Sequence, residues 1–138
     1  MKRIGVVYAT VTKHSHRIAR AIGEALGVDA KSVDERPALK DLDLLFIVGG
    51  IYAGKSLPKL LKYVGDLDAS GVKAVALVTS CASKEHRQDE VRRILEQKGV
   101  GVVDEILCQA SFLCNNSGRP NQADVDEAVA FALRLAGD

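Results

Sequence analysis

Short runs of apolar residues alternate along the chain with longer segments in which apolar residues recur at helical spacing. Four runs are nearly continuous in Val, Ile and Leu, which is typical of parallel strands buried on both faces. They cover residues 3–8, 44–48, 72–78 and 100–107, and a weaker run covers 28–33. The pattern therefore predicts five strands.

Three of the segments between these runs, and the segment after the last run, carry one apolar stripe each, which predicts amphipathic helices. The stripes are Ile18, Ala21, Ile22, Ala25 and Leu26; Leu57, Leu60, Leu61 and Val64; Val91, Ile94 and Leu95; and Val125, Ala128, Val129, Ala132, Leu133 and Leu135. Alternating strands and helices in a short chain require βαβ crossovers. We therefore expect an α/β fold: a three-layer sandwich in one domain, residues 1–138, with helices on both faces of a five-stranded parallel sheet.

Composition narrows the function classes. The 138 residues include 19 Lys and Arg against 18 Asp and Glu, a formal net charge of +1, which argues against a nucleic-acid binder driven by bulk charge. The three cysteines lack CxxC spacing, so neither a disulfide framework nor a zinc site is predicted. No apolar stretch approaches the length of a membrane span or of a signal peptide, and we expect a cytoplasmic protein.

In a doubly wound fold, ligands lie at the carboxyl ends of the strands, which directs attention to the loops that follow them. The first loop places three hydroxyls, on Thr10, Thr12 and Ser15, between a strand and a helix, with Lys13 and His14 beside them. Free amides and the dipole at a helix start favour an anion there. The alternative is that Thr12 or Ser15 only caps the helix.

This loop resembles the first loop of the flavodoxin family, Thr/Ser-x-Thr-Gly-x-Thr/Ser directly after a buried strand. The three hydroxyls fall on the family's hydroxyl positions, and Lys13 stands where the family has a glycine. The resemblance implies the flavodoxin-like strand order 2-1-3-4-5 and an FMN cofactor. The residues implied to hold its phosphate are Thr10, Val11, Thr12, Lys13, His14 and Ser15.

The segment from Gly49 to Ser56 matches the P-loop pattern G-x-x-x-x-G-K-[ST] and follows a predicted strand. Two observations argue against a nucleotide hydrolase. Pro58 lies three residues after Lys55 and disfavours a regular helix that begins at the lysine. The only acidic candidate for a magnesium ligand, Asp104, lies inside a predicted strand and not at its end.

The flavodoxin resemblance gives two further loops a role at the flavin ring. It implies that Gly50, Ile51, Tyr52, Ala53 and Gly54 lie at the ring, with Tyr52 packed against it and the Ala53–Gly54 peptide near its reactive nitrogen. The small residues Ser80, Cys81 and Ala82 are implied to bring backbone amides to the pyrimidine edge. Alternatively, Tyr52 is a surface tyrosine and Cys81 a small packing residue.

Three hypotheses for function follow. The first, which we favour, is a monomeric FMN-binding protein that shuttles electrons between redox partner proteins. In this hypothesis the protein is an electron carrier and not a substrate-specific enzyme. The second is a flavodoxin-domain oxidoreductase that acts on a substrate, as in relatives of protoporphyrinogen oxidase. The third is a binding or regulatory module that has kept the fold without FMN. The nearly balanced charge departs from the acidic surface common among flavodoxins, which steers them to basic partners.

Overall fold

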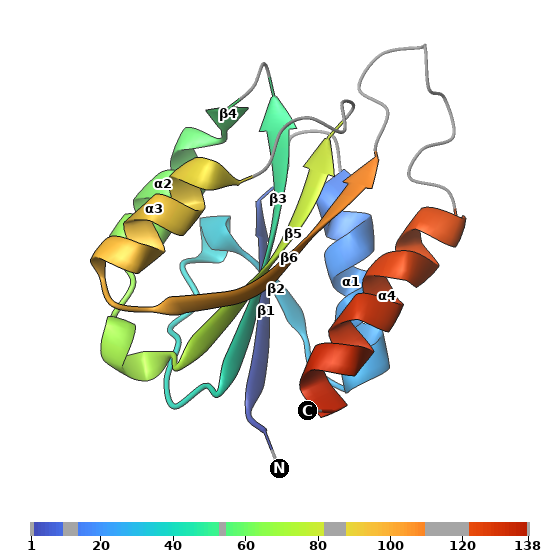
Figure 1. Cartoon of the computed structure of the whole chain (residues 1–138), viewed down its shortest axis with the longest axis horizontal. Helices are drawn as coiled ribbons and strands as arrows, with labels where there is room; N and C mark the ends of the chain where they lie inside the picture. Colours follow the sequence, from blue (N-terminus) through green and yellow to red (C-terminus); the bar gives the residue numbers. More distant parts are fainter. Residues whose placement is uncertain (1, 10–13, 53–54, 82–87, 110–121, 138) are drawn as a thin grey trace.

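The computed structural model describes residues 2–9, 14–52, 55–81, 88–109 and 122–137 (Figure 1). In chain order the elements are β1 (Ile4–Ala9), α1 (His14–Leu26), β2 (Ala30–Ser32), η1 (Val33–Glu35), β3 (Leu44–Tyr52), β4 (Lys55–Ser56), α2 (Pro58–Gly65), η2 (Ala69–Gly71), β5 (Ala74–Cys81), α3 (Asp89–Gln97), β6 (Gly101–Gln109) and α4 (Gln122–Gly137). The two η elements are single turns of 3-10 helix. The alternation of strands and helices expected from the sequence is confirmed.

Five parallel strands form the sheet in the order β2-β1-β3-β5-β6. The two-residue β4 lies off this path and pairs antiparallel with β3. Numbered without β4, the order is 2-1-3-4-5, as expected for a flavodoxin-like fold. Helices α1 and α4 cover one face of the sheet and α2 and α3 the other, which makes three layers (Figure 1).

Burial on both faces explains the nearly continuous apolar runs. In β3, Phe46 packs in the cluster under α1 and α4, whereas its neighbour Ile47 packs in the cluster under α2 and α3. Both side chains are completely buried. Because successive side chains of a strand point to opposite faces, a strand covered on both sides needs an apolar residue at every position.

Three of the strands are longer than the apolar runs that predicted them. β3 continues beyond residue 48 to Tyr52, β5 beyond 78 to Cys81, and β6 beyond 107 to Gln109. Pairing continues across these ends, since Gly49 and Gly50 lie opposite Thr79 and Ser80. Polar and small residues thus stay in the sheet because a neighbouring strand accepts and donates their backbone hydrogen bonds. The weak run at 28–33 forms only the short β2.

The expectation for Pro58 has a local outcome. Pro58 is the first residue of α2, a position where its missing N–H removes no helical hydrogen bond. Among the described residues, no helix is long and apolar enough to span a membrane. The same residues contain no group of His, Cys, Asp and Glu side chains that is able to hold a metal ion.

Candidate functional site

Three adjacent strands end at one edge of the sheet, and each leads into one of the predicted loops. Ala9 of β1 lies opposite Gly49 of β3, and Gly49 lies opposite Thr79 of β5. The chain therefore leaves β1, β3 and β5 side by side at this edge (Figure 1). The three segments singled out by sequence, far apart along the chain, start from neighbouring positions, which is the arrangement needed for a shared ligand.

The predicted site residues divide into two groups. Seven lie outside the described residues: Thr10, Val11, Thr12, Lys13, Ala53, Gly54 and Ala82. The backbone is described for the other seven: His14, Ser15, Gly50, Ile51, Tyr52, Ser80 and Cys81. His14 and Ser15 open α1, the next three end β3, and the last two end β5.

Ser15 is a predicted site residue with a buried hydroxyl. It is completely buried in the first turn of α1, and its Oγ has no hydrogen-bond partner among the residues that the structure describes. As the second residue of the helix, Ser15 is not its N-cap, so that alternative is wrong for this residue. A buried hydroxyl without a partner costs about 1–3 kcal/mol, which a ligand oxygen recovers. The neighbouring first-turn amides also lack helical acceptors, so this position fits a phosphate group.

The structure contradicts the P-loop hypothesis. In a P-loop the lysine and the following Ser or Thr begin a helix whose amides surround a phosphate. Here Lys55 and Ser56 form β4, which pairs antiparallel with Tyr52 and Ile51. The helix α2 begins only at Pro58. The motif is therefore part of a β-hairpin.

Gly49, the first glycine of that motif, and the adjacent Gly50 lie inside β3, and both are buried. The second glycine of the pattern, Gly54, lies outside the described residues. A Cβ on Gly49 would lie 2.7 Å from Leu60 Cδ2 and 3.0 Å from Gln88 Oε1. Gly49 is therefore needed because α2 and the residue before α3 pack directly on the strand backbone. Its role is packing, and it does not surround a nucleotide phosphate.

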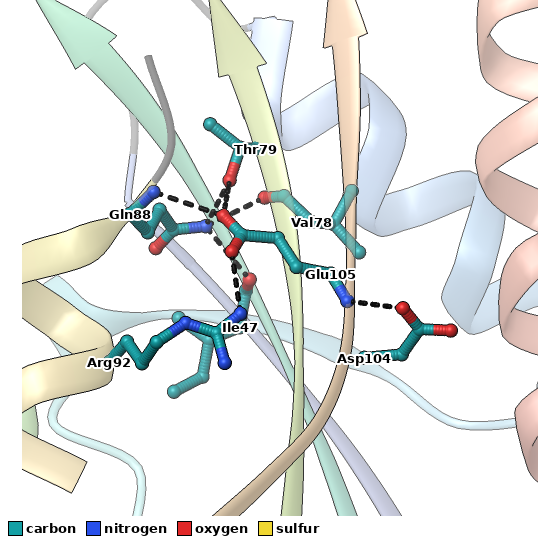
Figure 2. Close-up of polar contacts among 7 residues, drawn as sticks. All are labelled: Ile47, Val78, Thr79, Gln88, Arg92, Asp104 and Glu105. Carbon is teal, nitrogen blue, oxygen red and sulfur yellow. Dashed lines mark hydrogen bonds and ion pairs between the residues drawn. The ribbon is translucent and has the colours of Figure 1, made fainter. Parts of the chain in front are cut away.

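Just below this edge lies a buried polar cluster that the sequence analysis did not identify (Figure 2). Its centre is the Glu105 carboxylate, which accepts hydrogen bonds from Thr79 Oγ1 at 3.0 Å and from the Gln88 backbone N–H at 3.0 Å. Its other oxygen pairs with Arg92 Nη2 at 2.8 Å. The Glu105 side chain is only 5% exposed, whereas Arg92 is 35% exposed. One sequence feature could have revealed this cluster: Glu105 lies inside a strand predicted to be buried on both faces, and a buried charge requires partners.

A cavity of about 590 Å³ lies elsewhere, between the segment after β2 and helix α2. Its lining includes Tyr63, whose hydroxyl donates a hydrogen bond to the Pro37 carbonyl oxygen at 2.6 Å. Burial raises the pKa of Tyr63 to about 12. None of the seven predicted site residues that the structure describes lines this cavity, so the candidate site is the strand edge and not the cavity.

The fold is that of an α/β protein with a doubly wound parallel sheet, and the carboxyl ends of its strands form the candidate site. A model of the flavodoxin domain matches residues 5–111, and the chain therefore belongs to the flavodoxin family. The match begins in β1 and extends past β6, so it includes all three strands that form the edge.

Individual proteins are similar to this chain over nearly its whole length. An uncharacterized protein of Methanocaldococcus jannaschii is 25% identical over 137 residues, and the match covers 89% of this chain and 90% of that protein. A flavodoxin from the domain Archaea has a TM-score of 0.72 at 20% identity, covering 99% of this chain and 97% of that one. A flavodoxin, WrbA-like protein from Agrobacterium tumefaciens has a TM-score of 0.74 at 20% identity, covering 99% and 96%. At such identities the two structures show a shared fold.

Proposed function

We propose that the chain binds FMN at the carboxyl edge of β1, β3 and β5 and carries electrons between redox partner proteins. The observation that carries the proposal is the Ser15 hydroxyl, completely buried and without a partner among the described residues, in the first turn of the helix that follows β1. The membership of the flavodoxin family and the expectation from the first-loop hydroxyls support the same cofactor.

The chain's own part in this function is to bind and orient the cofactor. Ser15 Oγ donates a hydrogen bond to a phosphate oxygen, and the unpaired amides at the start of α1 add to the attraction for the anion. The strand ends carry the small residues Gly50, Ser80 and Cys81, so a flat ring system is able to approach the backbone there closely. FMN supplies the redox chemistry, since it accepts and releases electrons singly or in pairs.

The first experiment is a visible absorption spectrum of the purified protein, followed by titration with FMN. Flavin peaks, or saturable uptake of added FMN, are expected. A protein that shows no flavin peaks and takes up no FMN would refute the proposal and leave the FMN-free module. Electron exchange with partner proteins, without turnover of a small-molecule substrate, separates the carrier from the substrate-specific oxidoreductase.

A serine variant tests the phosphate site directly. Ser15→Ala is expected to lower the affinity for FMN by about tenfold while leaving the affinity for riboflavin, which lacks the phosphate, unchanged. Ser70→Ala is the matched control, because Ser70 lies in η2 at the opposite end of the sheet and bonds only to Asp68 among the described residues. Equal losses for FMN and riboflavin in Ser15→Ala would place the phosphate elsewhere.

A further inference from the structure

One carboxylate oxygen of Glu105 accepts hydrogen bonds from a residue near the end of β5 and from the residue before α3. Glu105 Oε2 accepts from Thr79 Oγ1 and from the Gln88 backbone N–H, both at 3.0 Å (Figure 2). Thr79 lies two residues before Cys81, which ends β5, and Gln88 directly precedes α3. Glu105 reaches both from β6, where its register partner in β5 is Leu77. One side chain thus links three elements at the candidate site.

The Gln88 side chain extends this link to β3. It is completely buried, and its Nε2 donates to the Val78 carbonyl oxygen at 3.0 Å and to Thr79 Oγ1 at 3.1 Å. A longer contact of 3.4 Å reaches the Ile47 carbonyl oxygen in β3. The side chain therefore bridges the two central strands close to the ends that carry Gly50 and Ser80.

The missing side chain at Gly49 makes room for this bridge. A Cβ there would lie 3.0 Å from Gln88 Oε1, closer than side chains normally approach. Gly49 and Thr79 are register partners on the face covered by α2 and α3. The position of Gln88 is thus set from three sides, by β3, by β5 and by Glu105.

Arg92 completes the cluster and holds the carboxylate in place. Its Nη2 lies 2.8 Å from Glu105 Oε1, so each carboxylate oxygen has at least one donor. An ion pair with one buried partner, as here, contributes little net stability, because desolvation of Glu105 offsets the attraction. What it does supply is a defined position for the groups that it bonds, which an apolar side chain of similar size would leave free.

We propose that Glu105 is a positioning residue for flavin binding: through Thr79 and Gln88 it holds the ends of β3 and β5 in the arrangement that receives the ring. This inference rests on the proposed function, and it assigns a role to residues that do not touch the cofactor. The residues that it positions are Gly50, Ser80 and Cys81.

Three substitutions separate this role from a general contribution to stability. Thr79→Val keeps the shape of the side chain and removes the hydroxyl that donates to Glu105 and accepts from Gln88. Glu105→Met removes both acceptor oxygens and keeps the length of the side chain. Glu105→Gln keeps one carbonyl oxygen for Thr79 and Gln88, and the half-exposed Arg92 is able to turn to solvent. Glu24→Gln, at the exposed Arg20–Glu24 pair on α1, is the control.

Affinities for FMN and riboflavin, measured where each variant is fully folded, give the decisive readout. Thr79→Val is expected to weaken both flavins equally, by about threefold, and Glu105→Met by about tenfold. Glu105→Gln is expected to restore affinity to within about twofold of the original protein. The equal effect on the two flavins distinguishes the ring end from the phosphate end, where Ser15→Ala affects FMN alone. Unchanged affinities in Thr79→Val and Glu105→Met, or equal losses in Glu105→Met and Glu105→Gln, would overturn the proposal.

Hydrogen exchange without added flavin keeps the test independent of the proposed function. Amides at Gly50, Ser80 and Cys81 are expected to exchange about tenfold faster in Thr79→Val and Glu105→Met, while those in the middle of β1 stay unchanged. Unaltered exchange at the strand ends would overturn the positioning role. If the protein binds neither flavin while these amides respond as expected, the proposed function fails and the structural link from Glu105 to the strand ends stands.

Discussion

Gly49→Ala is a sharp test of how the site edge is packed. Gly49 is buried near the end of β3, and its φ is not among the positive values in the described part of the chain, so its backbone accepts an alanine. The added methyl would lie 2.7 Å from Leu60 Cδ2 and 3.0 Å from Gln88 Oε1. Leu60 is completely buried. The cost of the substitution is therefore a cost of packing.

The expected magnitude follows from these distances. Carbon atoms in contact normally lie about 3.5–4.0 Å apart, so Leu60 or the strand must move by about 1 Å. Such overpacking costs about 1–3 kcal/mol, and the lower entropy of the unfolded alanine chain offsets about 0.4–1 kcal/mol of it. We expect Gly49→Ala to lower the free energy of unfolding by about 1–2 kcal/mol, with further loss of flavin affinity because Gln88 is displaced.

Urea unfolding of matched glycine variants measures this effect. Gly101→Ala is the control, because Gly101 also lies in a strand and its Cβ would meet nothing within 4 Å. It is expected to leave stability unchanged or raise it by about 0.5 kcal/mol. Leu60→Val withdraws both Cδ methyls, so in the double variant the cost of Gly49→Ala is expected to fall by about 1 kcal/mol. Equal stability of Gly49→Ala and Gly101→Ala would refute the packing explanation.

Three further predictions concern charge and chemistry. Burial raises the pKa of Tyr63 to about 12, so the stability that Tyr63 contributes is present below about pH 10 and is lost as the pH rises toward 12. In urea unfolding at about pH 9 and about pH 11, the original protein is expected to lose this stability at the higher pH, and Tyr63→Phe is expected not to lose it. Hydrogen bonds from the Arg3 backbone N–H and from Lys73 lower the pKa of Asp43 below 3.8, so its contribution is present above that pH and is lost as the pH falls through the lowered value. The stability difference between the original protein and Asp43→Asn is expected to shrink in acid unfolding below about pH 4, and a constant difference would contradict it. Because Lys55 lies in a hairpin and not in a P-loop, we expect it to have no role in ATP hydrolysis. An ATP hydrolysis activity of the purified protein that Lys55→Ala abolishes would contradict this prediction.

Much of the fold was predictable from local patterns. Two-sided burial forces apolar residues into every position of the central strands, as at Phe46 and Ile47, so the strands are visible in the sequence. The helical stripes, such as Ile18 and Ile22 of α1, follow from the same need to cover the sheet. The general place of the site also follows, because parallel strands bring their carboxyl ends to one edge. The complete burial of Ser15 in the first turn of α1 could be seen only in the structure.

Other features depend on partners that are distant in the sequence. The match at Gly49 to Ser56 is the same string of residues in a P-loop and in a hairpin, and only the pairing of Lys55 with Tyr52 decides between them. The polar strand ends likewise depend on pairing between β3 and β5. Glu105 and Gln88 are 17 residues apart, and neither carries a local motif. Periodicity reports which side of an element is buried, whereas a hydrogen bond between elements depends on their packing in three dimensions.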